Sequence, residues 1–463
     1  MPISRRFAEL LRGPVLFSAS TLLVACGSAP QRPAPPVFNG DSTFTIDLPD
    51  SDETGPSQGA WWQRSVTSRI ANALDGVLAA NPALRRADAE TEAARAVWRQ
   101  AEAELGPALN VDGSVGVQKV SGERRSTSRS IGIAGELPID VSGALAAQRD
   151  AARATYDAVA ADTAQLRSDL ARDLLLAVID GAEARQRRQL LDAQIALASR
   201  LLSLIELRFT QGLASSVDVL QQRDQLASLR QQLPATELDA RRADNRVRQI
   251  GGLQKPPEPT LTMDDLPDIN GRFAPIQPRD LLLRRADLRA ANARLRAADA
   301  RFATALAERW PQLSLSASGI TRALSGDVST IISAALDASL TLFDGGRKLA
   351  VADQRRAELV AAGEQLIDDW IAAVIDADDL LLAEASVRER IDLSQQRLDT
   401  AEALLKAAQR RFERGVSDYL PVLEALRSLQ QQQRDHIALL AELARTRVRL
   451  HRALGEPVAT EAA

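Results

Sequence analysis

Side chains that could do covalent or metal chemistry are scarce in this sequence. The 463 residues include one cysteine, Cys26, and two histidines, His436 and His451. Both histidines fall in stretches with helical character, and no acid–histidine cluster surrounds either, so packed or solvated histidines are favoured over metal ligands. The sequence contains no glycine-rich phosphate loop and no Ser/His/Asp signature. We therefore expect neither an enzyme nor a resident metal or other cofactor.

Cys26 stands where a secreted chain would be processed. Two arginines near the start precede the apolar segment 15–24, which is too short to span a membrane. Residues 23–27 read Leu-Val-Ala-Cys-Gly, the pattern of a lipobox, in which a peptidase cuts before the cysteine and its thiol then carries diacylglycerol. We expect residues 1–25 to be a lipoprotein signal peptide and Cys26 to be the lipid attachment site; an ordinary secretory signal is the alternative. Gly27, rather than an acid, favours sorting to the outer membrane.

Composition and charge narrow the function classes further. The chain is 45% hydrophobic and 25% charged with a net charge of −4, which suits a large core or several domains. No basic patch stands out along the sequence, so nucleic acid is disfavoured as a partner.

One helical pattern occurs twice, roughly 200 residues apart, which indicates a duplicated unit. In both 208–220 and 411–424, a helical stretch runs into a glycine and a second helical stretch follows. A glycine at a helix end typically adopts the left-handed conformation. We therefore expect two helical hairpins with tips at Gly212 and Gly415.

Polar residues after each tip predict the start of the next helix. Ser215 and Asp218 have the spacing of a capping box. At the second tip, Ser417 or Asp418 is the expected N-cap, and Pro421 falls in the first turn, where a missing N–H costs little.

Between the helical stretches the hydrophobic period changes to two, which predicts strands. The strands form two pairs, 107–118 with 130–141 and 311–321 with 332–343. Each is about ten residues long, the length that a tilted strand needs to cross a bilayer. One face is apolar and the other small or polar, as in a membrane barrel with a wet lumen; a soluble sheet with one buried face is the alternative. The polar stretches 121–128 and 322–330 are the expected hairpin loops. The expected apolar face includes Leu109, Val111, Val115, Val117, Ile131, Ile133, Leu137, Ile139, Leu313, Leu315, Leu336, Leu340 and Leu342.

Two helix-like runs are far longer than an ordinary globular helix. Residues 143–211 and 347–414 would each extend roughly 100 Å at about 1.5 Å per residue. Such helices need packing partners along their length, and the spacing of their apolar residues favours coiled-coil packing. We expect 216–250 and 418–454 to return as partner helices, with Pro234 kinking or breaking the first.

Compositional shifts suggest the domain boundaries. The segment 26–60 is rich in Pro, Ser, Gly and acid and is expected to be a tether without a core of its own. A Pro-rich linker then separates two repeats. The expected order is first repeat 61–252, linker 253–280, second repeat 281–455 and C-terminal tail 456–463.

These stretches resemble the TolC-like outer-membrane efflux family, most closely its lipid-anchored branch in tripartite pumps. The resemblance extends from Cys26 to about Gly455. It rests on the order of the motifs around four strands and two hairpins. The matching motifs are the run from Trp62 to Leu84 with its Asn81–Pro82 pair, the stretches 285–291, 310–315 and 340–347, and the Arg411-Phe412-x-x-Gly415 motif.

The resemblance implies a mostly α-helical fold with a membrane β-barrel. Three protomers would each give four strands to a twelve-stranded barrel, continued by a periplasmic α-helical barrel. It also implies a lipid-anchored location at the outer membrane, a periplasmic adaptor and an inner-membrane pump as partners. Four strands alone would leave open edges, which lipid does not tolerate, so oligomerisation is expected on physical grounds as well.

The resemblance places both tips at the periplasmic mouth of the channel. Asp218, Asp418 and Glu424 lie within about three helical turns of the tip glycines. Related channels carry an acid nine residues after the second tip glycine, so Glu424 is the first candidate for a threefold ring of charge. The alternative is a solvated residue that pairs at most with Arg427.

The tip also departs from the family pattern. Some relatives have Arg where this chain has Ser417, and some have Asp where it has Pro421. The architecture therefore transfers by resemblance, but a particular gating contact does not.

Two functions fit these features. The first is a passive export duct for drugs, metals or other small molecules, the outer-membrane channel of a tripartite efflux pump. The second is a periplasmic adaptor or scaffold lipoprotein that binds partners through coiled-coil hairpins. An adaptor usually has one hairpin flanked by soluble β domains, so two hairpins interleaved with two strand pairs favour the duct.

Overall fold

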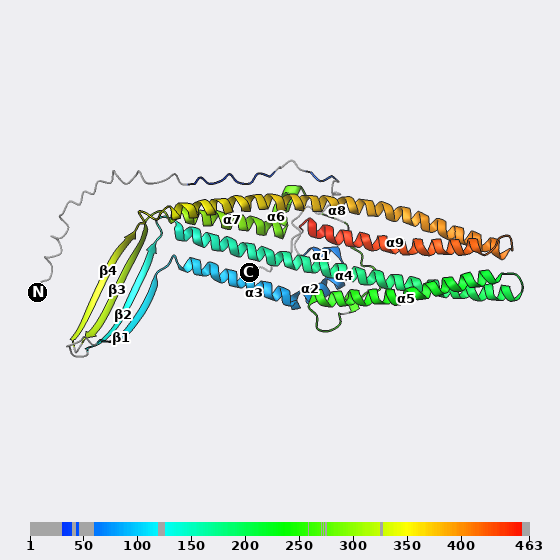
Figure 1. Ribbon diagram of the computed structural model, residues 1–463, viewed down its shortest axis with the longest axis horizontal. Coiled ribbons are helices and arrows are strands. Elements are labelled where there is room, and N and C mark those ends of the chain that lie inside the picture. Colours follow the sequence, from blue (N-terminus) through cyan, green and yellow to red (C-terminus); the bar gives the residue numbers. More distant parts are fainter. Residues whose placement is uncertain are drawn as a thin grey trace.

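The molecule is elongated, with a β-sheet at one end and helical hairpins that extend away from it (Figure 1). The structure, a computed structural model, describes residues 30–38, 43–45, 60–118, 126–257, 259–269, 271, 273, 276–324 and 327–455. The expected signal peptide, Cys26 and the tail 456–463 lie outside the described residues.

Four antiparallel strands form the sheet, in the order β1-β2-β3-β4. They are β1 (Ala108–Gln118), β2 (Ser126–Ile139), β3 (Gln312–Leu324) and β4 (Asp327–Ser339). The central pair joins the two halves of the chain, since β2 runs beside β3 from Ser128 opposite Leu324 to Ile139 opposite Leu313. Each of β1 and β4 has a single neighbour, so both outer edges of the sheet are open.

Three strands differ in their bounds from the prediction. β2 begins at Ser126, inside the expected loop 121–128, β3 extends to Leu324, inside the expected loop 322–330, and β4 spans 327–339 rather than 332–343. The polar composition of these stretches suggested loops, but Ser and Thr also pair well across an antiparallel ladder, as the Thr321 and Thr330 hydroxyls do over 3.1 Å.

The end of β4 is set by the turn that starts the next helix. The Asp344 carboxylate accepts hydrogen bonds from the backbone N–H groups of Gly346 and Lys348, each over 2.9 Å. Leu340 and Leu342 therefore lie beyond β4 rather than on its apolar face, which corrects the expectation for both.

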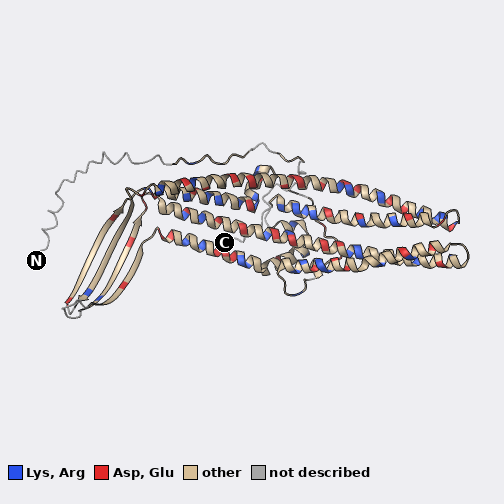
Figure 2. Ribbon diagram, viewed as in Figure 1, with Lys and Arg blue, Asp and Glu red and all other residues tan. Residues whose placement is uncertain are grey.

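The pairing register aligns the apolar faces of all four strands, as the alternation predicted. One row across the sheet contains Val111, Ile133, Gly319 and Ile332. On the opposite face, serine pairs bond across strands: Ser114 with Ser130, and Ser318 with Ser333, both over 2.8 Å. Charged residues are spread along the helices and are sparse on the strands (Figure 2).

Two helical hairpins form the long part of the molecule. α4 (Ala144–Thr210) pairs with α5 (Ser216–Gly251), and α8 (Arg347–Glu413) pairs with α9 (Leu420–Ala453). α4 and α8 each contain 67 residues, which corresponds to about 100 Å. On the side nearer the sheet, α3 (Pro82–Ala103) packs against α4, and α7 (Ala286–Ala307) packs against α4 and α8.

Pro234 was predicted to kink or break α5, and it does not break it. The helix is continuous from Ser216 to Gly251. Pro234 is exposed, so the carbonyl that loses its helical partner can bond to water. The neighbouring Leu229 and Leu233 pack on α4 residues and hold the helix in place.

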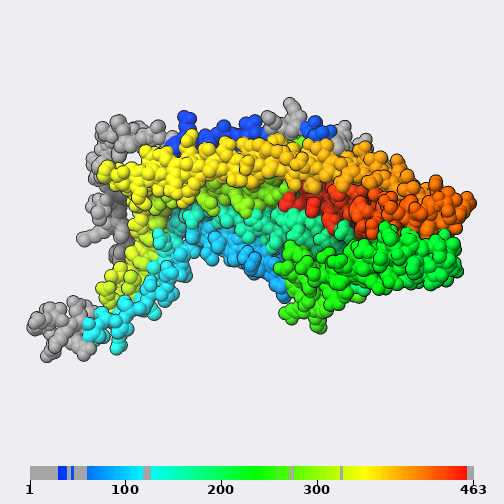
Figure 3. Space-filling view, turned by 45° about the vertical axis from the view of Figure 1, so that its right-hand side comes forward, coloured from blue at the N-terminus to red at the C-terminus, as the bar shows by residue number. Residues whose placement is uncertain are grey.

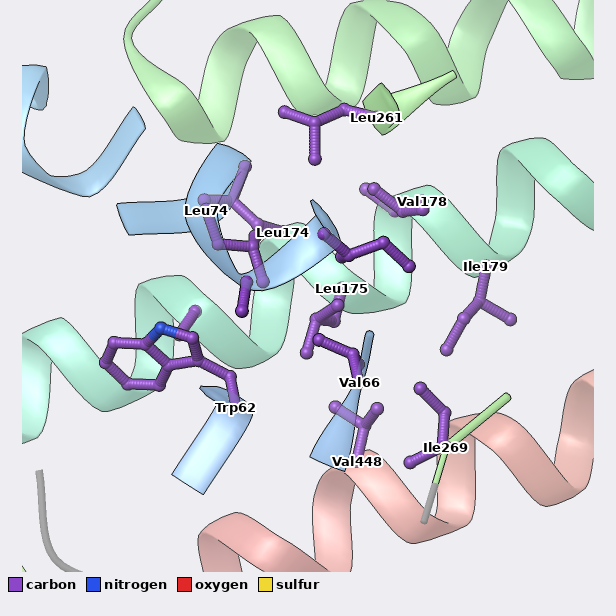
Figure 4. Close-up of a cluster of buried hydrophobic side chains, with 14 of the residues drawn as sticks. Trp62, Val66, Leu74, Leu174, Leu175, Val178, Ile179, Leu261, Ile269 and Val448 are labelled. Atoms are coloured by element: carbon purple, nitrogen blue, oxygen red, sulfur yellow. The ribbon is translucent and has the colours of Figure 1, made fainter. Parts of the chain in front are cut away.

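The main hydrophobic core lies midway along the bundle (Figure 1), and Figure 4 shows a close-up of its side chains. It joins α1 (Trp61–Ser65) and α2 (Ser68–Ala80) to α4, to the linker with its short helix η1 (Pro259–Leu261), and to α9. η2 (Pro278–Asp280) and α6 (Leu281–Arg284) lead into α7. Core side chains include Trp62, Leu74, Leu174, Leu175, Val178, Leu261, Ile269 and Val448. Both repeats thus share one core.

None of the helices in the described ranges combines the length and apolar character needed to cross a bilayer.

Candidate functional site

The two hairpin tips lie at the end of the molecule farthest from the sheet (Figure 1). Gly212 and Gly415 have φ angles of 76° and 69°, as predicted. A Cβ at either position would meet nothing within 4 Å, so any substitution cost is backbone strain, about 1–2 kcal/mol. The residue after each glycine closes the turn with a backbone hydrogen bond. Leu213 N–H donates to the carbonyl of Arg208 over 2.8 Å, and Val416 N–H donates to the carbonyl of Arg411 over 2.9 Å.

The first tip contains the predicted capping box. Asp218 N–H donates to Ser215 Oγ over 3.1 Å, and Ser215 N–H donates to the Asp218 carboxylate over 2.8 Å. The Asp218 carboxylate therefore stabilises the start of α5 within its own turn.

The second tip differs from the prediction, because neither Ser417 nor Asp418 caps α9. The helix begins at Leu420, and its N-cap residue, Tyr419, already has helical angles and makes no side-chain cap bond. Ser417 Oγ is buried without a hydrogen-bond partner among the described residues, and Asp418 is exposed. The turn is instead arranged to bury the Tyr419 ring, which is 1% exposed.

Tyr419 ties the second hairpin to the first. Its hydroxyl donates to Gln222 Oε1 on α5, and Gln222 Nε2 donates to the carbonyl of Ala198 on α4 over 2.8 Å. The ring packs edge-to-face on Phe412 with 5.4 Å between centroids. Burial, reinforced by the nearby charge of Asp218, raises the pKa of Tyr419 above its ordinary value.

Further glutamines continue this contact along the bundle. Gln225 Nε2 on α5 donates to Gln430 Oε1 on α9 over 3.0 Å, and Arg427 Nε donates to Gln225 Oε1 over 2.7 Å. Farther from the tips, Gln194 Nε2 on α4 donates to Gln433 Oε1 on α9 over 3.1 Å. We call Gln194, Gln222, Gln225, Gln430 and Gln433 the glutamine seam; it joins the two hairpins through neutral hydrogen bonds.

Neither the contact of Tyr419 with the first hairpin nor the glutamine seam was predicted from the sequence. A signal was present: Gln222 and Gln225 occupy the same helical face as Leu226 and Leu229, where buried apolar residues are expected. Periodicity does not reveal which distant amides such buried glutamines meet.

The acid proposed for a charge ring has no partner among the residues that the structure describes. Glu424 is exposed on α9, and its side chain makes no hydrogen bond or ion pair with the described residues. Arg427 points elsewhere, to Gln225 and to Asp224 at 3.8 Å. The ion pair considered for Glu424 and Arg427 is therefore not formed.

Apolar side chains are exposed around both tips. The group includes Leu213, Val217, Leu220, Val416 and Leu420, each at least 47% exposed. Apolar residues clustered at an exposed end commonly mark a protein contact surface.

Both histidines are packed rather than arranged as ligands. His451 is buried; its ring stacks on Trp61 with 5.9 Å between centroids and packs at a tilt against Phe273 with 4.6 Å between centroids. His436 Nδ1 lies 3.2 Å from Ser394 Oγ. In the part of the chain that the structure describes, no group of three or more His, Cys, Asp or Glu side chains could hold a metal ion.

An open-edged sheet with one apolar and one polar face, carried on helical hairpins of about 100 Å, defines a class of protein. It is the class of outer-membrane channels in which a β-barrel continues into a helical barrel. The sequence profile of the outer membrane efflux protein family matches residues 73–253 and 278–456. The chain belongs to this family.

Individual relatives agree with this assignment. The cation efflux system protein CusC of Escherichia coli is 27% identical over 436 residues, which are 89% of this chain and 92% of CusC. The outer membrane protein OprJ of Pseudomonas aeruginosa is 28% identical over 444 residues, 89% of this chain and 90% of OprJ.

Solved structures show the same fold. A membrane protein of Pseudomonas aeruginosa matches with a TM-score of 0.80 and 25% identity, over 93% of this chain and 100% of that one. A structure of CusC matches with a TM-score of 0.81 and 22% identity, also over 93% and 100%. The chain is thus an outer-membrane efflux protein, and the adaptor or scaffold alternative is not supported.

Proposed function

We propose that this protein is a passive duct, the outer-membrane channel of a tripartite efflux pump. The observation that carries the proposal is the register of the sheet, which gives every strand one apolar and one polar face. Apolar residues facing lipid and polar residues facing a lumen are what a water-filled membrane barrel requires. The protein itself would perform no catalysis and convert no energy.

The channel is proposed to be a homotrimer. β1 and β4 leave open edges, and in lipid an edge must find a partner. β1 of one copy pairing with β4 of the next closes a barrel of about twelve strands, wide enough for a channel.

An exposed apolar stripe on α8 supports the same assembly. Its five members recur at eleven-residue intervals, which returns a helix to nearly the same face after about three turns. Each is between 39% and 55% exposed in the single chain. The α8 stripe consists of Val360, Ile371, Leu382, Leu393 and Leu404.

The partners are proposed to be a periplasmic adaptor and an inner-membrane pump, with the exposed apolar side chains of the tips as the docking surface for the adaptor. The cargo is proposed to be a small molecule or ion. The relatives differ in this respect: CusC is named for cation efflux, and OpmQ of Pseudomonas aeruginosa for pyoverdine export.

A lipid on Cys26 is proposed to anchor the protein to the outer membrane. Radioactive palmitate should label the wild type and leave Cys26→Ser unlabelled. Label on the variant would contradict the attachment site.

The duct itself is tested by single-channel recording. Purified protein added to a planar bilayer should give discrete ionic conductance steps. A protein that assembles as a trimer yet gives no conductance would contradict the duct.

A further inference from the structure

Residues 30–38, which precede the first helix in the chain, are docked on the bundle. We call residues 30–38 the strap; it lies along α8 in the same chain direction (Figures 1 and 3). The composition of segment 26–60 predicted a tether without a core of its own. In the described part of that segment, side chains of residues 30–38 pack on α7 and α8.

Near its start, the strap is held by charged hydrogen bonds. Arg32 donates to both carboxylate oxygens of Asp299 on α7, with Nε and Nη2 each 2.8 Å from an oxygen. Arg356 Nε on α8 donates to the backbone carbonyl of Gln31 over 2.9 Å. A bidentate arginine–carboxylate pair fixes the orientation of the strap as well as its position.

Near its end, the strap is held by aromatic packing. Phe38 packs edge-to-face on Trp370 of α8, with ring centroids 5.5 Å apart. A little further on, Phe44 is 9% exposed in the same hydrophobic cluster, and Thr45 bonds to Asp378 through its N–H and its hydroxyl, over 2.7 and 2.6 Å.

Between the two contacts, the strap in extended form covers nearly the same distance as the part of α8 beside it. An extended polyproline II chain advances about 22 Å from Gln31 to Phe38. An α-helix rises about 21 Å from Arg356 to Trp370. Prolines at 33, 35 and 36 favour this extended form. They line an apolar groove with Leu295, Leu359, Val360 and Ile367.

The docked strap limits how far Cys26 can travel. Without docking, the chain from Cys26 to the first helix could reach roughly 110 Å. With Gln31 held at Arg356, Cys26 stays within about 18 Å of that point. Arg347, where α8 leaves the sheet end of the bundle, is about 14 Å along the helix from Arg356.

We propose that the strap is a spacer that fixes the depth of the lipid anchor relative to the barrel. With the strap docked, the acylated Cys26 stays within about 18 Å of Arg356, and the sheet end of α8 lies within that reach, so the acyl chains would enter the leaflet that the base of the sheet borders. The groove between α7 and α8 is its docking surface. This inference rests on the proposed lipid anchor and outer-membrane location.

Docking is tested by a charge exchange in the full-length purified protein. Chymotrypsin cleavage after Phe38 reports release, because the ring must leave Trp370 to enter the protease. Arg32→Glu and Asp299→Arg should each raise the cleavage rate about threefold or more, and the double variant should return most of the way to the wild-type rate. Arg294→Glu, on α7 but paired with Asp162, should change nothing. Equal rates in the wild type and Arg32→Glu, or no recovery in the double variant, would overturn docking.

Depth is tested by shortening the chain between the lipid and the strap. In outer-membrane-like vesicles, deletion of residues 28–30 should strain the docked strap, because Cys26 loses about 10 Å of reach. Cleavage after Phe38 should then rise about threefold in the acylated deletion variant. It should stay at the wild-type rate in the deletion variant that also carries Cys26→Ser, and in a variant with three residues inserted at the same place.

Unchanged cleavage in the acylated deletion variant would overturn the spacer role. Palmitate labelling of each sample reports separately whether the anchor is present, and channel conductance reports separately on the duct.

Discussion

At the scale of residues, the tips combine one buried phenol, a seam of buried amides and exposed acids. Tyr419 and Gln222 are almost fully buried and bonded to each other, so they fix how the two hairpins meet. Glu424 is exposed and unpaired within the described residues, so it remains free to act toward other copies. Asp218 is engaged in its capping box, so of the three candidate acids only Asp418 and Glu424 have no partner among the described residues.

Glu424→Gln tests the proposed charge ring. Three carboxylates about 6 Å apart would repel pairwise by about 3 kcal/mol at an effective dielectric near 20, and would attract cations. The variant should lower cation selectivity and weaken block by divalent cations added from the periplasmic side. Asp224→Gln, also an exposed acid but paired with Arg427, is the control. If Glu424→Gln leaves both selectivity and block unchanged, Glu424 is not part of the gate.

Tyr419→Phe tests the buried phenol through pH. Because the folded pKa is raised above the unfolded value of about 10, the contribution to stability is fully present below pH 10. It is lost as the pH rises from there through the folded pKa, at up to about 1.4 kcal/mol per pH unit. The Phe variant should be less stable by about 1–2 kcal/mol at neutral pH, since Gln222 loses its donor, and should lack this alkaline loss.

Absorbance gives a direct check on the same residue. At pH 11 the folded wild type and Tyr419→Phe should show the same phenolate absorbance at 295 nm, because Tyr419 is still protonated. A lower absorbance in the variant than in the wild type would mean that Tyr419 ionises at its ordinary pKa and is not protected by burial in the folded tip.

At the scale of elements, the strands are defined by two faces and the long helices by their packing. The register places neighbouring residues of β4 on opposite faces: Ala334 faces the apolar side opposite Ala317, and Ala335 the polar side opposite Ser316. The same alanine chemistry can thus be compared in two environments, which isolates the effect of the face.

Ala334→Arg and Ala335→Arg form a matched pair. On the lipid side an arginine near the midplane should cost about 2–4 kcal/mol, whereas on the lumen side it should be solvated. We expect Ala334→Arg to reduce the yield of assembled oligomer in membranes, and Ala335→Arg to assemble normally but alter conductance. Equal assembly defects in both variants would contradict the assignment of the two faces.

At the scale of the whole molecule, the single chain leaves two kinds of surface uncovered. Its sheet ends in two open edges, and the α8 stripe exposes five large apolar side chains to solvent. In the proposed trimer, neighbouring copies would cover both.

Leu404→Glu tests whether the stripe contacts another copy. Burying an unpaired carboxylate is costly, so the variant should increase the fraction of monomer about tenfold, equivalent to roughly 1.4 kcal/mol. Ala403→Glu, exposed and about 100° around the same helix, is the control and should assemble normally. The measurement is light scattering of detergent-purified protein. Equal monomer fractions in both variants would remove the stripe from the interface.

Local conformational preference determined what the sequence predicted well. The left-handed glycines at both tips and the Ser215–Asp218 capping box depend on neighbours a few residues away. The period of two likewise predicted which alternate residues share a face within each strand, because a strand cannot change which side its alternate residues face; it did not predict that β4 ends before Leu340 and Leu342.

Tertiary structure decided what depends on residues far apart in the chain. Tyr419 displaced the predicted cap because burial against Gln222 outweighs a local hydrogen bond. Pro234 is tolerated because α4 supports α5. The strap is ordered because Asp299 and Trp370, hundreds of residues away in sequence, form a surface that a Pro-rich composition cannot reveal. The sequence thus determined the elements and their period, and only packing between distant segments determined how the tips and the N-terminal strap are held.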